Sequence, residues 1–468
     1  VASVLAQDSV FTLARRGLGA QRVGQTLKAD LVLTGTVRAL PAHYRLRAEM
    51  IRVADETQIW VEDLLVEQSR TAGLELELAK SLAFRLNTGI AGNRGGGDAP
   101  SGDLTISAAA ALDSGNESSS ERREAYEIFQ RAHHEWQTLE RHRMQDGLQH
   151  LLRAVELDPS LIAARVDLVN LCVTQSFFGF MAPAVAADIV RRTAATAFPA
   201  SGMAASDTGC WGEELFQDLP PHADAMLPAL GWVSFHVDRN LPAALQAFSL
   251  SDHLPHDTWT TRVRVALALS RHRFGDAIEM LRAAIQLDPF SPWLHARLAW
   301  ALHLNGQAAE SLECIRHTIA QFPDHEGANL YGAMLMSFGG EAEQGIELAR
   351  DLAQRLPYFD MATAVHAYAL ACAGRADEAR VILERLQWLS RERFVLSSFT
   401  LAVHVALGDH DAALAELRTA EETRCPWFFQ MLADPRLEPL YGRPEFKQMH
   451  SILDRMEDSA ARQAETEE

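Results

Sequence analysis

The stretch RFGDAIEMLRAAIQLDPFSPWLHARLAWALHLNGQ, residues 273–307, has two apolar-rich halves with Pro289 between them. Both halves carry apolar side chains at the spacing of one helix face. Proline stops the first helix because it has no N–H to donate and its ring clashes with the preceding turn. The stretch therefore predicts two consecutive helices, and similar stretches recur along the chain.

The prolines of these stretches follow a fixed interval. Four of them are separated by 34 residues each: Pro255, Pro289, Pro323 and Pro357. A period of 34 is typical of an array of helix pairs, in which a proline closes each pair. Pro159 closes an earlier pair, but its distance of 96 residues to Pro255 is not a multiple of 34. We therefore expect an irregular insertion near residues 175–225.

Small residues repeat with the same period. They stand twelve positions before each closing position, at Gly147, Ala243, Ala277, Ser311, Gly345, Ala379 and Ala413. Two antiparallel helices need one point where their backbones nearly touch, and a large side chain there would force them apart. We expect these seven residues to be repeat-packing positions.

The combination of period, small residue and proline resembles the tetratricopeptide repeat (TPR) family. In the stretch 273–307, Ala277, Leu281 and Pro289 occupy the family's small, large and proline positions. The resemblance implies a mainly α fold, a TPR α-solenoid whose first helices line a concave groove that binds proteins or peptides.

The N-terminal part of the chain follows a different pattern. Residues 44–53 alternate between apolar and charged side chains, which predicts a strand with one buried face. Residues 30–40 and 57–67 are its expected partners. Helices are expected at 19–29 and 71–87. Together these elements predict a small α/β (α+β) domain with a mainly antiparallel sheet.

The same part resembles the TolB-like N-terminal domain of multidomain bacterial proteins. The resemblance rests on VLAQDSVF (4–11), LKADLVLTGTVR (27–38) and LRAEMIRVADETQIWVEDL (46–64). The first strand and helix of that family have no counterpart here, so a partial domain is expected. The resemblance carries over no catalytic residue.

Further segments complete the expected domain layout. Residues 125–171 resemble the first TPR of proteins that join these two domains, and residues 425–449 resemble their closing module. The predicted layout is a partial TolB-like domain at 1–90, a flexible Gly/Ser-rich linker at 91–121, a TPR domain at 122–456 and an acidic tail at 457–468.

Charge and composition argue against several classes of function. The formal net charge is −19, which opposes direct contact with nucleic acid. No run of about 18 apolar residues occurs, so no membrane insertion is expected. The five cysteines form no C-x-x-C pair, and His133 to Glu135 lack the second histidine of a zinc protease motif. We expect no catalytic residue, no cofactor and no metal.

Aromatic and basic residues mark the expected peptide groove. Alignment on the prolines places seven candidates at groove-facing positions: Trp259, Arg262, Trp293, Trp300, His303, Met334 and Tyr368. Trp and Arg are typical of binding hot spots. The alternative is that these side chains pack between neighbouring repeats.

The two resemblances together predict a non-enzymatic interaction and regulatory portion of a bacterial regulator. Family members with this domain pair are mostly transcriptional regulators with an upstream winged-helix domain. Alternatives are the accessory part of a nucleotide cyclase or protein kinase, and an envelope assembly or transport adaptor. A cytoplasmic location is expected, with the periplasmic side of a single-pass membrane regulator as the alternative. Self-association stays open.

Overall fold

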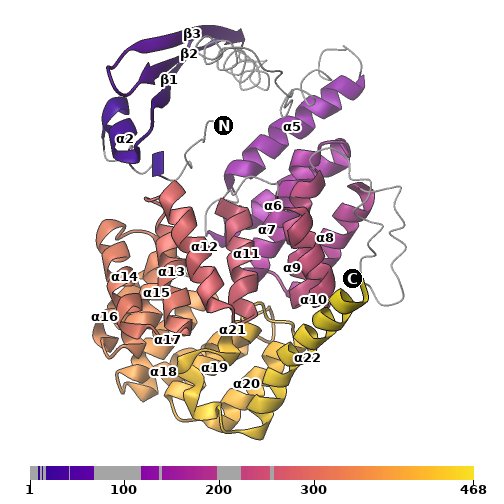
Figure 1. The fold of residues 1–468 in the computed structure, drawn as a ribbon, viewed down its shortest axis with the longest axis vertical. Helices are drawn as coiled ribbons and strands as arrows, with labels where there is room; N and C mark the ends of the chain where they lie inside the picture. Colours follow the sequence, from indigo (N-terminus) through magenta and orange to yellow (C-terminus); the bar gives the residue numbers. More distant parts are fainter. Residues whose placement is uncertain are drawn as a thin grey trace. The chain divides into compact units, whose positions relative to one another are not determined.

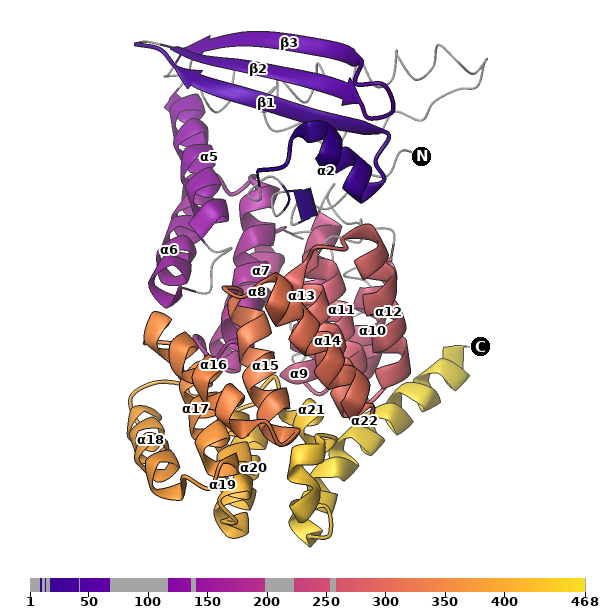
Figure 2. The same ribbon diagram turned by 90° about the vertical axis from the view of Figure 1, so that its left-hand side faces the viewer.

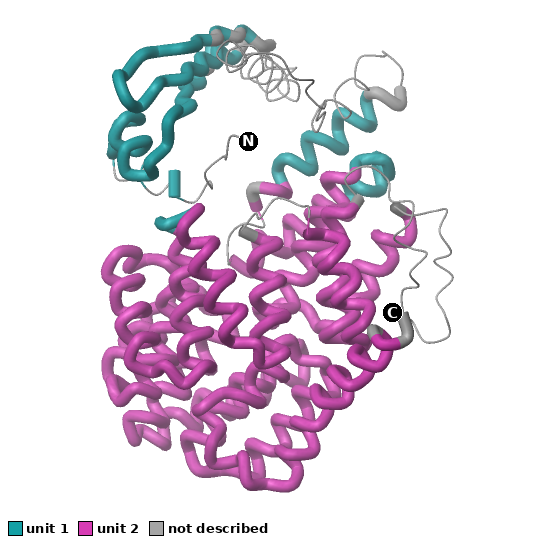
Figure 3. The backbone as a smooth tube through the Cα atoms, in the orientation of Figure 1, with its two compact units in different colours: residues 1–131, 153–161, 288–290 teal, residues 132–152, 162–287, 291–468 magenta. Residues whose placement is uncertain are grey.

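The computed structural model describes residues 9, 10, 13, 17–41, 43–67, 117–135, 140–197, 223–252 and 258–467. The chain divides into two compact units (Figure 3). Unit 1 comprises residues 1–131, 153–161 and 288–290, and unit 2 comprises residues 132–152, 162–287 and 291–468.

Unit 1 contains a three-stranded antiparallel sheet in the order β1 (Leu31–Ala39), β2 (His43–Arg52) and β3 (Gln58–Glu67). Figure 2 shows helix α2 (Ala20–Leu27) beside these strands. The three predicted strands and the predicted helix at 19–29 are confirmed. The helix expected at 71–87 lies outside the described residues.

The alternating pattern of β2 explains which face of the sheet is buried. Ala48 and Met50 pack with Trp60 of β3 in a small core. On the opposite face, Arg45 donates two hydrogen bonds to the Asp63 carboxylate, at 2.8 and 2.9 Å. Apolar and charged side chains alternate because successive residues of a strand point to opposite faces.

Helices form the remaining elements. α5 (Glu117–Glu135) begins within the segment expected as a linker, of which residues 91–116 lie outside the described part. Unit 2 is helical, and Figure 1 shows its helices as an array. Their bounds are α6 (Arg141–Leu157), α7 (Ile162–Phe177), α8 (Pro183–Ala197), η4 (Ala223–Met226), α9 (Leu227–His236), α10 (Leu241–Leu250), α11 (Thr258–Ser270), α12 (Phe274–Leu287), α13 (Pro292–Leu304), α14 (Ala308–Gln321), α15 (Glu326–Phe338), α16 (Ala342–Arg355), α17 (Asp360–Cys372), α18 (Ala376–Leu389), α19 (Ser397–Ala406), α20 (His410–Glu422), α21 (Phe428–Leu432), η5 (Pro435–Leu440) and α22 (Pro444–Glu467).

The helices pair as the 34-residue period predicts. Each pair has a first helix that is almost entirely buried, such as α13, and a second helix with one buried face, such as α14. Pro289, Pro323 and Pro357 follow the ends of α12, α14 and α16. Pro255 lies outside the described residues. The mainly helical repeat fold, preceded by a small sheet, is confirmed.

The region expected as an insertion near 175–225 is helical in part. α7 runs to Phe177, and α8 follows after a short connection. Residues 198–222 lie outside the part that the structure describes. At the other end, residues 457–467 of the expected acidic tail continue α22.

The small residues of the period lie where the helices of a pair meet. A Cβ added at Gly345 would come within 2.9 Å of the Ala333 carbonyl oxygen. The Ser311 hydroxyl donates a hydrogen bond of 2.7 Å to the Ala299 carbonyl oxygen across the same type of contact. The other members of this set are buried: Gly147, Ala243, Ala277, Ala379 and Ala413.

A second feature with the same period closes the first helix of each pair. Gly306, Gly340, Gly374 and Gly408 are 34 residues apart and all have positive φ, between 76° and 89°. No atom lies within 4 Å of a Cβ built on them, so the backbone conformation, and not packing, calls for glycine. His272 occupies the same position one repeat earlier, with φ 57°.

No helix in the described part of the chain is both long enough and apolar enough to cross a membrane.

Candidate functional site

The inner face of the array is the surface formed by the first helices of the pairs, from α7 to α19. Residues 425–440, here called the C-terminal segment, lie against this face. Trp427 contacts Phe177 of α7 and Phe399 of α19, with ring centroids 4.5 and 5.1 Å apart. Phe429 contacts Phe235 of α9 at 5.1 Å. The chain therefore places its own polypeptide where a TPR array receives a ligand.

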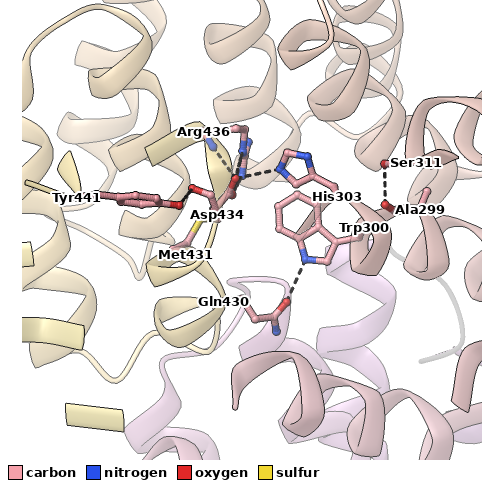
Figure 4. Close-up of polar contacts among 9 residues, drawn as sticks. All are labelled: Ala299, Trp300, His303, Ser311, Gln430, Met431, Asp434, Arg436 and Tyr441. Carbon is pink, nitrogen blue, oxygen red and sulfur yellow. Dashed lines mark hydrogen bonds and ion pairs between the residues drawn. The ribbon is translucent and has the colours of Figure 1, made fainter. Parts of the chain in front are cut away.

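Polar side chains of α13 fix the position of this segment (Figure 4). The Trp300 indole N–H donates a hydrogen bond of 3.1 Å to Gln430 Oε1. His303 Nε2 lies 3.0 Å from Asp434 Oδ1. All four side chains are buried, so loss of either hydrogen bond would leave a buried polar group without a partner, which is energetically unfavourable.

Asp434 is the centre of the most buried charged cluster among the described residues. Arg436 Nη2 donates to Asp434 Oδ2 at 2.7 Å, and the Arg436 backbone N–H donates to Oδ1 at 3.0 Å. Burial raises the pKa of Asp434, but the Arg436 charge and the His303 hydrogen bond outweigh burial, so the pKa lies well below its usual value. Tyr441 donates to the Asp434 carbonyl oxygen at 2.9 Å. The carboxylate is thus ionised and fully paired.

Two residues with positive φ also contact the C-terminal segment. His272 Nε2 lies 2.7 Å from the Phe429 carbonyl oxygen. The Arg239 guanidinium lies 4.3 Å from the centre of the Phe429 ring, and Arg239 has φ 58°. Both residues adopt a backbone conformation that favours glycine, and both use their side chains to hold Phe429.

Four of the predicted groove residues lie inside the array. Trp300 and His303 bond to the C-terminal segment, and Tyr368 packs under the Arg436 guanidinium at 5.0 Å. Met334 is fully buried in α15. All four side chains are buried, and the C-terminal segment covers Trp300, His303 and Tyr368.

The other three predicted groove residues meet at one pocket between α7, α9, α11 and α13. The Arg262 guanidinium lies 4.6 Å above the Trp293 ring, and the Trp259 indole N–H donates to Thr174 Oγ1 at 3.2 Å. Trp259 and Arg262 are partly exposed. The pocket is lined by Val173, Thr174, Phe177, Phe178, Trp232, Trp259, Arg262, Val263, Ala266, Trp293 and Arg297.

Sequence analysis missed eight of the eleven lining residues, among them Arg297 and Trp232. Arg297 follows Trp293 by four positions on α13, so both side chains lie on one helix face. This four-residue spacing could have identified Arg297 as a neighbour of Trp293 from the sequence. Trp232 comes from α9, whose apolar residues surround the whole helix and single out no face. The inner position of the C-terminal segment was also missed.

The described residues contain no group of three or more His, Cys, Asp or Glu side chains that fits a metal ion. Burial raises the pKa of the Cys172 thiol to about 12, so this thiol is protonated and a poor nucleophile at neutral pH. The pocket lining holds neither a carboxylate nor a thiol.

Comparison with protein families agrees with the repeat architecture. Residues 268–334 match the tetratricopeptide repeat family. A search among curated proteins finds no match. The chain is similar to the crystal structure of a tetratricopeptide repeat protein from Parabacteroides merdae, with 10% sequence identity over 71% of this chain and 99% of that chain and a TM-score of 0.36. It is also similar to PilF of Pseudomonas aeruginosa, with 15% identity over 51% of this chain and 95% of that chain and a TM-score of 0.31. The family match and the 34-residue helix pairs together identify the array of unit 2 as a tetratricopeptide-type helical repeat.

Proposed function

We propose that this chain is the non-enzymatic, protein-binding portion of a bacterial multidomain regulator. TPR repeats imply a role in protein–protein interaction. The resemblance of residues 4–64 to a TolB-like domain, followed by a TPR array, supports a regulator of the kind that carries a winged-helix DNA-binding domain upstream.

One observation carries the protein-binding role. The inner face binds a stretch of polypeptide, the C-terminal segment, through buried aromatic rings and side-chain hydrogen bonds. Trp259 and Arg262 present the same residue types at the pocket rim and remain partly exposed. Trp and Arg on a concave surface are the residue types that dominate binding energy at interfaces. Trp259 and Arg262 form the rim of the pocket, and a partner protein therefore binds the array at this rim.

Peptide selection tests this role directly. A library of displayed peptides is selected on the intact chain, and the tightest peptide is measured by fluorescence anisotropy. The double variant Trp259→Ala with Arg262→Ala should bind that peptide at least about ten-fold more weakly. Circular dichroism melting shows whether the variant is folded.

The chain offers a matched control for this experiment. Trp388 and Arg385 lie on α18, a second helix of a pair, and Trp388 is 53% exposed. The double variant Trp388→Ala with Arg385→Ala removes the same residue types from the outer face and should bind like the wild type. If both double variants lose binding equally, or if neither does, the rim is not the interaction site.

The regulatory context has its own test. The coding sequence upstream of Val1 in the native gene should encode a winged-helix domain. A cyclase or kinase domain there would overturn the transcriptional part of the proposal and leave the protein-binding part intact.

A further inference from the structure

Three residues that line the pocket each carry a buried hydrogen-bond donor with no acceptor among the described residues. These donors are Nη2 of Arg297, Nε1 of Trp232 and Nε1 of Trp293. The exposed fractions of these three residues are 2%, 2% and 6%. Buried donors are normally paired, and each exception needs a physical reason. Three exceptions that line one pocket point to an acceptor that binds from outside the chain.

Arg297 makes the strongest case because its charge is buried. Its Nη1 donates to the Tyr331 hydroxyl at 2.6 Å, but its Nη2 has no acceptor within the described ranges. The rings of Phe177, Tyr331 and Trp427 lie 5.6 to 5.8 Å from the guanidinium carbon. Aromatic faces offset part of the cost of burying a cation, but they accept none of the in-plane N–H groups.

The charge, polarity and size of the rest of the pocket indicate what kind of ligand it can bind. A second guanidinium, that of Arg262, lines the pocket, and the lining contains no Asp or Glu. The remaining lining is largely aromatic and aliphatic. The volume of the cavity is ≈ 50 Å³. The acidic charges elsewhere on the chain are screened beyond about 8 Å at physiological ionic strength.

We propose that this pocket binds a small monocarboxylic acid with an apolar or aromatic body. The carboxylate accepts hydrogen bonds from Arg297 and from the indole N–H groups of Trp232 and Trp293. The body of the acid packs against the rings and aliphatic side chains of the walls. The acid is a small-molecule ligand of the array, so the inference goes beyond the proposed binding of a protein partner.

Other ligand classes fit the pocket less well. A metal cation would meet two guanidinium groups and no anionic ligand. A neutral hydrocarbon would fill the walls but leave all three buried donors unpaired. Phosphate would satisfy the donors, but its double charge and strong hydration do not suit apolar walls.

Isothermal titration of the intact chain at pH 7 tests the proposal with two matched pairs of probes. Phenylacetate is compared with its neutral amide, phenylacetamide, and 4-methylpentanoate is compared with 4-methylpentanamide. At least one acid should bind, and the amide with the same body should bind about ten-fold more weakly or worse, because a hydrogen bond to a charged group is the stronger kind. Equal binding of acid and amide would overturn the proposal, and so would binding of neither acid.

Variants of the pocket connect binding to this site. Arg297→Gln should weaken acid binding at least ten-fold, by about the contribution of a charge-assisted hydrogen bond. Ala266→Leu adds a larger side chain at the α11 wall and should block the pocket while Arg297 stays in place, which keeps the test valid if Arg297→Gln does not fold. Trp293→Phe keeps a ring but removes the N–H, and it should cause a smaller loss.

The control is Arg385→Gln, which removes an exposed guanidinium from α18 and should leave acid binding unchanged. Acid binding that survives both Arg297→Gln and Ala266→Leu would place the ligand elsewhere and overturn the proposal. The peptide experiment above is done without acid. A negative result for acid binding therefore does not change the interpretation of peptide binding.

Discussion

The two parts of the inner face differ in how their buried polar groups are paired. Where the C-terminal segment meets α13, Asp434 pairs with Arg436 and His303, and none of these three side chains has a buried polar atom without a partner. In the pocket between α7, α9, α11 and α13, Arg297 and two indoles keep donors without acceptors among the described residues. Both regions use the same residue types, aromatic rings and arginine. The difference teaches that residue type does not distinguish a structural contact from a candidate ligand site. What distinguishes them is whether the buried polar groups have hydrogen-bond partners within the chain.

The largest expected effect comes from the paired region. Asp434→Ala leaves the Arg436 charge buried and unpaired, so it should lower the free energy of unfolding by about 3–5 kcal/mol. Chemical denaturation followed by circular dichroism measures this change. Asp411→Ala is the matched control, because this carboxylate also pairs with an arginine but has a side chain that is 90% exposed. It should cost less than about 1 kcal/mol. If both variants lose a similar amount of unfolding free energy, the buried Asp434 cluster contributes no more to stability than an exposed ion pair.

A histidine beside the pocket should show the next largest effect through pH. His236 is buried, its Nδ1 has no partner within the described ranges, and its ring lies 5.2 Å from that of Trp232. Burial and the nearby Arg239 lower the pKa of His236 to about 3. Between pH 6.5 and 3 the unfolded chain therefore binds a proton that the folded chain does not, and stability falls as the pH falls.

The measurement compares wild type with His236→Gln at pH 7 and pH 5. From pH 7 to pH 5 the wild type should lose about 2 kcal/mol more unfolding free energy than the variant. Burial raises the pKa of Asp238 to about 6, which acts in the opposite direction, but this group is present in both proteins and cancels in the difference. Equal losses in the two proteins would show that His236 is hydrated or paired in solution.

Sequence patterns predicted the elements better than the inner face. The 34-residue period located the helix pairs, and the alternation in residues 44–53 located β2, because both signals are local along the chain. The indole N–H of Trp427 donates to the Phe177 carbonyl oxygen, which lies 250 residues away in the sequence. No periodicity reports a contact of that separation. Trp259, Arg262 and Trp293, which were predicted to face a peptide groove, line one pocket, and their role in binding stays a prediction.

The turn glycines provide a smaller perturbation that leaves both regions untouched. Gly374→Ala should lower the free energy of unfolding by about 1–2 kcal/mol. Gly374 has φ 76°, a backbone conformation that is strained for alanine even though no neighbouring atom would contact the new methyl group. The change in thermal midpoint measures it. Gly442→Ala is the control, since Gly442 has an ordinary φ and open space around it, and its midpoint should hardly move. Peptide and acid binding should survive in both.

The smallest expected effect returns to the pocket. Arg297→Met removes a buried charge that has no counter-ion in the described structure, so the free energy of unfolding should change by less than about 1.5 kcal/mol in either direction. Urea titration followed by fluorescence gives the value. If the variant is as unstable as Asp434→Ala, the guanidinium is a structural group and the contrast between the two regions disappears.

The position of the C-terminal segment has a consequence for the order of folding. The segment contacts α7, α9, α13 and α19, all of which precede it in the chain and leave the ribosome before it. Synthesis at about 5–20 residues per second leaves the aromatic inner face of the early helix pairs uncovered for some ten seconds or more. During this interval the nascent array exposes aromatic side chains that the C-terminal segment covers in the folded chain, and a chaperone can reach them.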